Sequence, residues 1–426
     1  MAVASPSPRK RMLIGICAGN FLEFYNFGVY AFFAPMLAAA YFPKGDHLVA
    51  LTLALLTFAI GFLARPVGAA VVAAYAARAG RRAALMLTFS LMGLGSALIA
   101  LTPGYDRIGI AAPVIVLLGR LIQGFSDGGE VGPATTLLFD LEAPAGRGGI
   151  ISLQYITQLC AMLTSVMVGA VLSAVLPHDA LYGWGWRVPF LLGLVVVPVG
   201  LFIRGSETME HAPSPQPALA ATTTTTTPVA AVALVLTVIA CGTIGTYMRA
   251  YGVSYAVSVL HLSPGIGMLA MSAGLATGIL ATIAGLPLAA RIGTIPLVLS
   301  STLAAMVLTW PLYHHAITAP GLASQLLLNV ALFAITNLPA AVLWKTMLGA
   351  LPERNRSLAF GLIYALAVSV FGGFTQPVVT WLITVTGSAM VPAWVSIALA
   401  PVGTAALLLL LRKQRGTQTR AAPALA

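Results

Sequence analysis

Charged residues are scarce in this sequence: Asp, Glu, Lys and Arg make up 8% of its 426 residues, and hydrophobic residues make up 59%. A soluble globular domain has about 25% charged residues and about 45–50% apolar residues. The chain therefore has too few charges to cover its apolar side chains with a hydrated surface, which excludes a water-soluble enzyme. The mean hydropathy of +0.95 indicates an integral membrane protein.

Cysteine and histidine are also scarce. The three cysteines lie inside apolar stretches, so we expect small core residues and neither disulfides nor metal ligands. The six histidines lie in loops or at the ends of apolar stretches, which argues against a histidine proton relay through the membrane and against a membrane enzyme. We expect no metal and no bound cofactor.

Long apolar stretches dominate the chain, and one membrane span takes about 20 residues. They lie near residues 12–37, 49–76, 82–102, 111–139, 148–176, 187–205, 229–257, 264–290, 295–316, 320–349, 356–386 and 390–411. The sequence thus predicts an all-α membrane protein with twelve transmembrane helices.

Basic residues decide the orientation of these spans. Twelve spans place both termini on one side, and with that side in the cytoplasm the outer loops keep only Lys44, Arg107 and Arg187. This is the excess of Lys and Arg that cytoplasmic loops carry. It accounts for the net charge of +11 without a nucleic-acid partner. We expect a monomer in a bacterial inner membrane, with both termini cytoplasmic.

A hydrophilic segment rich in Pro and Thr, residues 206–228, divides the chain into six spans and six spans. Such a composition is typical of a cytoplasmic linker. The predicted domains are an N-terminal six-helix bundle (1–205), this linker, and a C-terminal six-helix bundle with a short cytoplasmic tail (229–426). Both halves carry Ala-Ala-Arg-x-Gly after their second span, at 76–80 and 289–293, which suggests an internal repeat.

Charges inside predicted spans are functional candidates, because each costs at least about 2.5–3.5 kcal/mol at mid-membrane. They are Arg65, Arg120, Arg249, Lys345, Glu23, Asp127 and Glu130. The spans of the second half contain no acid, so any carboxylate that carries a proton belongs to the first half. Lys345 is close to the cytoplasmic end of its span, where we expect its side chain to reach the interface.

The fourth predicted span places four polar residues on one face, at spacings of three and four: Arg120, Gln123, Asp127 and Glu130. Gly124, Gly128 and Gly132 lie near that face and would let another helix approach closely. On the functional interpretation, Arg120 grips an anionic group with its planar fork. The alternative is a structural ion pair, in which Arg120 or Arg65 is neutralised by Asp127, Glu130 or Glu23.

The first span carries a polar stripe of Asn20, Glu23, Asn26, Phe27 and Tyr30. Glu23 is a candidate to carry a proton, or else it is the structural partner of an arginine. In the second half, Arg249 needs a counter-ion from the first half or from a ligand. Gln158, Asn329 and Tyr364 could hydrogen-bond a polar solute, or equally could bond neighbouring helices.

Five segments carry a family resemblance: GNFLEFYNFGVY (19–30), FLARPVGA (62–69), GRLIQGFSDGGEVG (119–132), GWRVPFLLG (185–193) and FGGFTQP (371–377). In this order they resemble the metabolite:proton symporter family of the major facilitator superfamily. Three of them are most similar to the citrate and tricarballylate symporters.

This resemblance implies the major facilitator fold, with two pseudo-symmetric six-helix bundles that rock about a central site. It implies a transporter that imports a small organic anion, such as citrate, tricarballylate or a related carboxylate, together with H⁺ or Na⁺. Ketoglutarate, shikimate and zwitterionic osmolytes are the substrates of other members. Arg120 and Arg249 would hold the anion, Tyr30, Gln123, Asn26, Gln158, Asn329 and Tyr364 would line the site, and Arg65, Arg78, Gly80, Arg81 and Arg187 would have gating or structural roles.

The sequence departs from this family at three acidic positions. Asn26 replaces an Asp associated with proton coupling, which leaves Glu23 as its substitute and makes an uncoupled facilitator or exchanger the alternative. Ala77 and Ala290 replace the acids of the two cytoplasmic loops that help to hold one gate shut. We therefore expect a different balance between inward-facing and outward-facing states.

Overall fold

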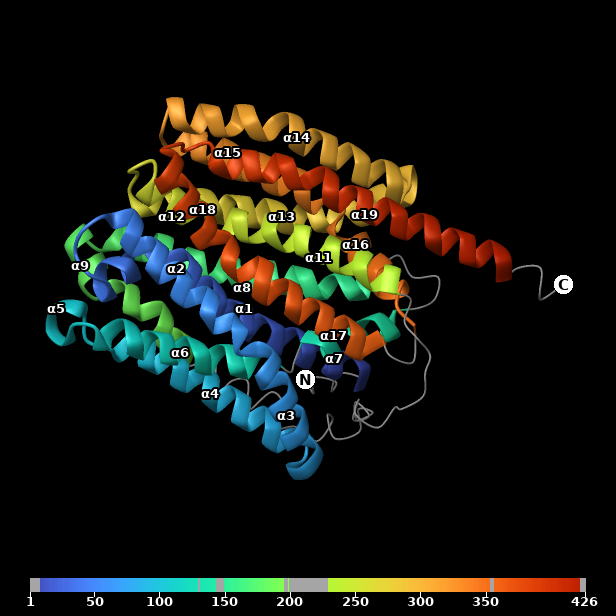
Figure 1. Ribbon diagram of the computed structural model, residues 1–426, viewed down its shortest axis with the longest axis horizontal. Helices are drawn as coiled ribbons and strands as arrows, with labels where there is room; N and C mark the ends of the chain where they lie inside the picture. The colour runs from blue at the N-terminus through green and yellow to red at the C-terminus, as the bar shows by residue number, and fades with distance from the viewer. Residues whose placement is uncertain are drawn as a thin grey trace, which may run out of the picture.

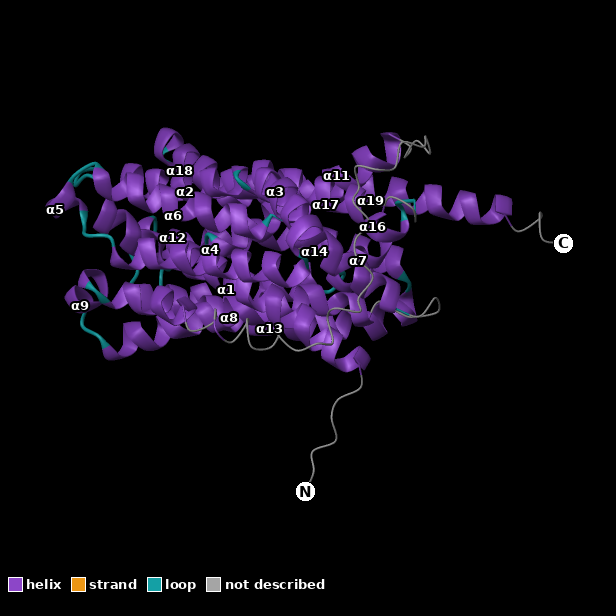
Figure 2. Ribbon diagram, turned by 90° about the horizontal axis from the view of Figure 1, so that it is seen from below, coloured by secondary structure: helices purple, strands orange, loops and turns teal. Residues whose placement is uncertain are grey.

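The structure, a computed structural model, describes residues 8–128, 131–142, 149–194, 198, 229–352 and 356–421. Every regular element within these residues is a helix, and the long helices run side by side in one general direction (Figures 1 and 2). The all-helical architecture predicted from the sequence is therefore confirmed for the described part of the chain. The linker 206–228 lies outside it, so the domain boundaries stay a prediction.

The helices of the first half account for five of its six predicted spans. Its elements are α1 (Pro8–Tyr41), α2 (His47–Leu63), α3 (Arg65–Ala79), α4 (Arg81–Leu101), α5 (Tyr105–Ile108), α6 (Ala111–Asp127), α7 (Val131–Leu141), α8 (Gly149–Val175), α9 (His178–Gly183) and the short 3₁₀ turn η1 (Gly185–Arg187). The sixth predicted span, 187–205, is described continuously only as far as residue 194.

The second half contains the other six predicted spans. Its elements are α11 (Val229–Ala250), α12 (Gly252–Ser258), α13 (Pro264–Ile292), α14 (Thr294–Thr318), α15 (Leu322–Asn337), α16 (Ala340–Gly349), α17 (Arg356–Ala367), the π-helical turn η5 (Val368–Gly372), α18 (Gly373–Thr386) and α19 (Val391–Ala421). Across the described residues, eight helical segments are long and apolar enough to cross a membrane by length and composition, six of them in this half.

The repeated Ala-Ala-Arg-x-Gly sequence adopts the same backbone conformation in both halves. Gly80 ends α3 with φ 86° and ψ 158°, and Gly293 ends α13 with φ 89° and ψ 156°. A positive φ of this size strongly favours glycine, because a side chain would clash with the backbone. Each glycine also precedes the next helix, so the sequence repeat corresponds to a structural repeat.

Glycines allow α2 and α3 to pack backbone to backbone against α6. A methyl group on Gly124 would lie 1.8 Å from the carbonyl oxygen of Gly61, and one on Gly128 would lie 2.0 Å from that of Arg65. The predicted role of Gly124 and Gly128 in close helix approach is confirmed; the surroundings of Gly132 lie outside the described side chains. This contact brings the polar face of α6 next to the start of α3.

Candidate functional site

Arg65 lies at a break between two helices. α2 ends at Leu63, and α3 starts at Arg65 with Pro66 in its first turn, a position that proline favours. Pro66 has no N–H to donate to the carbonyl of Phe62, and the hydroxyl of Ser369, from η5 in the other half, donates to that oxygen at 2.8 Å. The break thus sets the position of Arg65, and the hydrogen bond from Ser369 to Phe62 links the two halves there.

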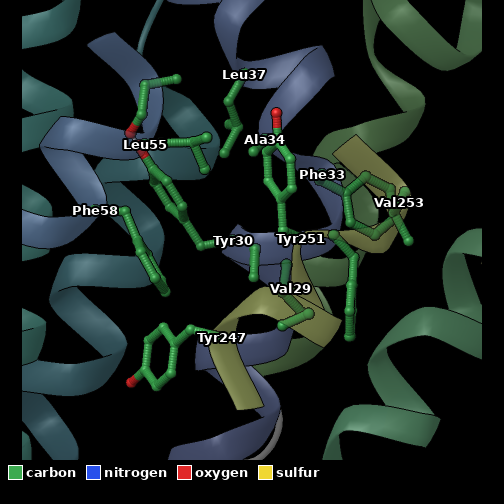
Figure 3. Packing of buried hydrophobic residues seen from close by; sticks show 14 of the residues in the cluster. Val29, Tyr30, Phe33, Ala34, Leu37, Leu55, Phe58, Tyr247, Tyr251 and Val253 are labelled. Atoms are coloured by element: carbon green, nitrogen blue, oxygen red, sulfur yellow. Dashed lines mark hydrogen bonds between the residues drawn. The ribbon is translucent and has the colours of Figure 1, made fainter. Parts of the chain in front are cut away.

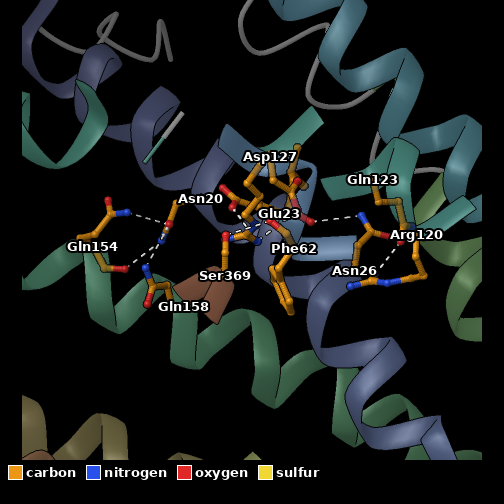
Figure 4. A network of polar contacts seen from close by, with 12 residues as sticks. Asn20, Glu23, Asn26, Phe62, Arg120, Gln123, Asp127, Gln154, Gln158 and Ser369 are labelled. Atoms are coloured by element: carbon orange, nitrogen blue, oxygen red, sulfur yellow. Dashed lines mark hydrogen bonds and ion pairs between the residues drawn. The ribbon is translucent and has the colours of Figure 1, made fainter. Parts of the chain in front are cut away.

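The Arg65 guanidinium holds two carboxylates with one nitrogen. Its Nη2 lies 3.5 Å from Glu23 Oε1 on α1 and 3.2 Å from Asp127 Oδ2 on α6 (Figure 4). The side chains of Arg65 and Glu23 are each 5% exposed, so these are buried ion pairs. The structural pairing considered for the acids of the first half therefore applies to Glu23 and Asp127, with Arg65 as the partner of both.

Arg120 on α6 has a different environment. Its Nη1 donates to Gln123 Oε1 at 2.7 Å, and its Nε is buried without a hydrogen-bond partner. Its guanidinium carbon lies 4.7 Å from the ring centre of Tyr30 and 4.6 Å from that of Phe58. Among the described residues no carboxylate forms an ion pair with it. Arg120 is thus a buried cation, 4% exposed, supported by aromatic rings and an amide.

Two acids remain to be placed relative to Arg120. Asp127, the last residue of α6, forms its ion pair with Arg65. Glu130 lies outside the described residues. Within the described residues, Asp127 forms no ion pair with Arg120.

Asn26 belongs to a chain of neutral polar groups that ends at Arg120. Its Oδ1 accepts from Ser96 Oγ at 3.0 Å, Ser96 Oγ accepts from Gln123 Nε2 at 2.8 Å, and Gln123 accepts from Arg120. Asn26 Nδ2 donates to the carbonyl oxygen of Leu22 at 3.2 Å. Because both ends of the Asn26 amide are used, the asparagine is held in place as a neutral group (Figure 4).

An aromatic cluster closes the space next to Arg120. Tyr247 on α11 lies 5.2 Å from Phe27, 5.9 Å from Phe62 and 6.5 Å from Phe58 between ring centres. Figure 3 shows the rings of Tyr30, Phe58 and Tyr247 side by side. The hydroxyl of Tyr30 donates to the carbonyl oxygen of Ala54 at 3.0 Å, so that ring is fixed. We call Phe27, Phe58, Phe62 and Tyr247 the aromatic wall.

Gln158 on α8 lies in a separate polar contact between α8 and α1. Asn20 and Gln154 exchange hydrogen bonds, and Gln158 Nε2 lies 3.4 Å from Asn20 Oδ1. Tyr364 on α17 is half-buried and interacts with Gln158 and Arg65. Both predicted site residues therefore lie near the Glu23–Arg65 side of the site rather than beside Arg120.

Arg249 lies elsewhere, at a cavity inside the second half. Arg249, Asn329, Tyr313 and Phe333 are among the residues that line it, and its volume of about 10 Å³ is enough for about one water molecule. Arg249 Nη2 donates to Thr246 Oγ1 at 3.1 Å, and its guanidinium carbon lies 5.5 Å from the Phe333 ring centre. The structure thus brings Arg249 together with Asn329, and it does not place Arg249 beside Arg120.

The predicted gating and structural residues have distinct positions. Arg187 donates to the carbonyl oxygens of Ala100 and Thr102 at 3.0 and 3.3 Å, which satisfies the end of α4. Arg78 is exposed in the last turn of α3, next to Gly80. The side chain of Arg81 is outside the described part of the chain.

The two halves contact each other at both ends of the molecule. At one end, Tyr155 donates to Asn337 Oδ1 at 2.7 Å, and Arg356 Nη1 lies 3.7 Å from Asp140 Oδ1. At the other end, His47 Nε2 lies 3.0 Å from the carbonyl oxygen of Ser258. Arg120 and Arg65 therefore lie between two sets of contacts, as expected of a site reached from alternate sides.

Sequence reasoning did not find several residues of this site. Ser96, Phe58, Phe62 and Ser369 are ordinary residues of apolar segments, and only their positions in the fold bring them to the two arginines. One signal was available. Pro66 has no N–H, which predicts that the carbonyl oxygen of Phe62, four residues earlier, lacks its helical donor and needs another one.

Comparisons with known proteins agree with this architecture. Residues 12–214 match the family described as "Sugar (and other) transporter". The chain is 33% identical to a citrate-proton symporter of Salmonella typhi over 95% of this chain and 94% of that protein. It is 30% identical to the alpha-ketoglutarate permease of Escherichia coli K12 over 97% of each.

Among solved structures, a D-xylose-proton symporter matches 95% of this chain and 97% of its own, with a TM-score of 0.73 and 15% identity. That identity supports the fold alone. The fold, the full-length similarity and the matching segments lead to one assignment: the chain is a multi-pass membrane transporter of the major facilitator fold and belongs to the metabolite:proton symporter family.

Proposed function

We propose that this protein imports a small organic anion, a di- or tricarboxylate such as citrate, tricarballylate or ketoglutarate, together with protons. One observation carries the proposal: Arg120 is 4% exposed and no carboxylate of the described residues pairs with it. A buried cation without a counter-ion is costly, and an anionic ligand removes that cost. The planar guanidinium suits a carboxylate, which it can bind with two parallel hydrogen bonds.

The names of relatives support the substrate class. They include a citrate-proton symporter and an alpha-ketoglutarate permease, whose names both specify carboxylates, and a putative proline/betaine transporter of Staphylococcus aureus at 29% identity. Shikimate and zwitterionic osmolytes are alternative substrates, since each also presents a carboxylate to Arg120.

The charges of the site support proton coupling. Arg65 and Arg120 contribute two positive charges, and ionised Glu23 and Asp127 contribute two negative ones, so these four groups sum to zero. A bound di- or tricarboxylate would leave the buried site with excess negative charge. A proton on Glu23 or Asp127 reduces that excess, so carrying the anion together with protons costs less than carrying it alone.

An uncoupled facilitator or exchanger is the second candidate, and Asn26 favours it. The Asn26 amide is fixed by Ser96 and Leu22 and cannot release a proton at the place where the family has an acid. The two candidates differ in whether the anion accumulates against its gradient.

Uptake by proteoliposomes distinguishes them. Radiolabelled citrate is offered with and without an inward proton gradient, in Na⁺ and in K⁺ buffers, with unlabelled organic acids as competitors. Gradient-driven accumulation supports proton symport, and equilibration without accumulation supports the facilitator. Uptake that requires Na⁺ identifies Na⁺ as the coupling ion in place of H⁺. Absence of uptake for every organic acid offered refutes the proposal.

Glu23→Gln tests the coupling residue. It removes the ionisable group and keeps the shape of the side chain that faces Arg65. Exchange of labelled for unlabelled anion should continue, while acceleration by the pH gradient should disappear. A pH response equal to that of the parent protein contradicts a coupling role for Glu23.

Several general properties complete the proposal. The protein acts as a transporter and not as an enzyme, as a monomer, with both termini in the cytoplasm of a bacterial inner membrane and with no nucleic-acid partner. The distribution of Lys and Arg among the loops supports the orientation. Cysteine labelling of the loops 42–46 and 259–263 in intact cells tests it, because these loops should react with an impermeant reagent.

A further inference from the structure

A hydrogen bond between the two halves lies at the break between α2 and α3. The hydroxyl of Ser369 donates to the carbonyl oxygen of Phe62 at 2.8 Å, and both residues are buried. In a continuous helix this carbonyl would accept from the N–H four positions later, but that residue is Pro66. Two donors take the place of the missing one, the N–H of Ala64 and the hydroxyl of Ser369. Of the two, only Ser369 comes from the other half, so this donor is present only while the halves are in contact.

Phe62 connects this hydrogen bond to the buried ion pairs. The guanidinium carbon of Arg65 lies 4.5 Å from the ring centre of Phe62, and Arg65 in turn pairs with Glu23 and Asp127 (Figure 4). We call Glu23, Arg65 and Asp127 the charged cluster. The strength of its contacts depends on where the guanidinium lies, so a shift of Phe62 alters the distances from Arg65 to both acids. Ser369 therefore acts on the charged cluster through Phe62.

Ser369 belongs to η5, a π-helical turn that is wedged between α2 and α11. Such turns occur frequently at functional sites. A methyl group on Gly373 would lie 2.9 Å from the Phe62 ring, and one on Gly372 would lie 3.0 Å from the Tyr247 ring. The turn therefore fits tightly against both helices. Because η5 belongs to the second half and α2 to the first, movement of one half relative to the other at this level acts on the bond between Ser369 and Phe62.

We propose that Ser369 is a positioning residue, which makes the geometry of the charged cluster depend on contact between the two halves. While the halves are in contact, Ser369 fixes Phe62, and Arg65 stays within reach of both acids. When alternating access moves the halves apart at this level, the Phe62 carbonyl loses this donor and Arg65 is free to move away from Glu23 and Asp127. A buried carboxylate is costly without its cation, and a proton compensates for the loss.

This proposal rests on the proposed proton-coupled transport and adds to it the contact through which the conformation of the halves reaches the acids. The described titratable and charged groups around Arg65 come from four helices: Glu23 on α1, Arg120 and Asp127 on α6, Tyr247 on α11 and Tyr364 on α17. Ser369 carries no charge. Its replacement therefore leaves every one of these groups in place and changes only their arrangement.

Three variants test the role of the hydroxyl. Ser369→Ala removes it, and Ser369→Thr keeps it. Ser254→Ala is the matched control, because Ser254 is also a fully buried serine of the second half, and its hydroxyl has no hydrogen-bond partner within the described part of the chain.

Two transport assays in proteoliposomes separate positioning from a general structural role. One measures exchange of labelled for unlabelled citrate at equal pH, and the other measures accumulation of citrate driven by an inward proton gradient. Ser369→Ala should lower accumulation about fivefold more than it lowers exchange, the size expected for one neutral hydrogen bond. Ser369→Thr should restore the ratio of accumulation to exchange, and Ser254→Ala should leave that ratio as in the parent protein.

A third measurement requires neither citrate nor a proton gradient. Backbone amide hydrogen exchange is followed in detergent by mass spectrometry of peptides that cover residues 60–70. Loss of the donor to Phe62 should speed exchange in this segment about fivefold in Ser369→Ala, because local opening at the break then lacks one hydrogen bond. Ser369→Thr and Ser254→Ala should exchange at the rate of the parent protein.

Two results overturn the proposal. One is amide exchange in residues 60–70 that is the same in Ser369→Ala and in the parent protein. The other is a fall of accumulation and exchange by the same factor in Ser369→Ala, which is the result of a merely structural role. A parent protein that exchanges citrate and never accumulates it refutes proton coupling instead, and the amide exchange then decides whether Ser369 holds the break.

Discussion

Loss of charge should destabilise the protein at Arg65 and leave its stability almost unchanged at Arg120, the two buried arginines of the first half. Arg65 and Arg120 are each 4% exposed. Arg65 lies 3.5 Å from Glu23 and 3.2 Å from Asp127, while Arg120 has no carboxylate of the described residues at contact distance. Their burial is equal, so a difference in stability between the two variants reports the difference in pairing.

Arg65→Gln leaves two carboxylates close together without their shared cation. Removal of one partner from a buried ion pair costs about 3–5 kcal/mol. We therefore expect a clearly lower unfolding temperature for this variant, together with loss of uptake.

Arg120→Gln removes a cation together with the cost of burying it. The protein loses the hydrogen bond to Gln123, a charged one of about 1.5–3 kcal/mol, and a cation–π contact of up to about 2 kcal/mol. The variant also no longer has the penalty for burying a charge, which is several kcal/mol and offsets these two losses. We expect a free energy of unfolding within about 1 kcal/mol of the parent protein.

Binding of the anion should change much more. Truncation of one partner of a buried charge pair costs about 2–5 kcal/mol, which is about 30-fold to 4,000-fold in affinity. Arg120→Gln should therefore fold normally in detergent and fail to take up citrate. Arg120→Lys keeps the charge without the planar fork, so its affinity for citrate should lie between those of the parent protein and Arg120→Gln.

Thermal unfolding in detergent, binding calorimetry and proteoliposome uptake measure these effects on the same preparations. Arg291→Gln, on the exposed end of α13, is the control. Equal destabilisation by Arg65→Gln and Arg120→Gln would refute the distinction between a paired and an unpaired arginine. Near-normal uptake by Arg120→Gln would refute its contact with the substrate.

Three further changes follow from the described contacts. Asn26→Asp adds an acid to the hydrogen-bonded chain that ends at Arg120. It should weaken citrate binding at neutral pH and increase the dependence of citrate affinity on pH. A citrate affinity that does not change between pH 5 and 8 contradicts this. Gly124→Ala places a methyl group 1.8 Å from the Gly61 carbonyl oxygen, so it should destabilise the protein by about 1–3 kcal/mol or more, and an unaltered unfolding temperature would contradict the close packing of α2 and α6. His47→Ala removes a link between α2 and α12 and should favour opening at that end, measured as faster labelling of a cysteine placed in the aromatic wall; slower labelling would contradict it.

Much of the fold could be predicted from the sequence, because membrane helices satisfy their backbone hydrogen bonds locally. Apolar stretches of about 20 residues must form helices in a bilayer, whatever their neighbours are. Eleven of the twelve predicted spans therefore correspond to described helices, and the sixth, 187–205, lies largely outside the described residues. The repeat at residues 76–80 and 289–293 appears as matching glycine turns with φ of 86° and 89°.

The candidate charged residues could also be found from the sequence, because a charge within an apolar span is conspicuous. Their partners could not. Arg65, Arg120, Glu23 and Asp127 allow several pairings, and hydropathy does not distinguish among them. The break before Pro66 and the glycine contact between α2 and α6 place Arg65 between the two acids, which leaves Arg120 with Gln123 and aromatic rings.

The position of Arg249 depended wholly on tertiary structure. The sequence predicts that it needs a counter-ion, since its half of the chain has no acid within a span. Which side of α11 faces the other half is decided by packing, and Tyr247 packs there against Phe27 and Phe62. Arg249 consequently faces Asn329 and Tyr313 inside its own bundle. The sequence by itself determined which residues carry charge into the membrane, because the composition and length of a span suffice for that. The packing of the helices decided which of those charges are neutralised and which remain to bind an anion, because pairing depends on distances between residues far apart in the chain.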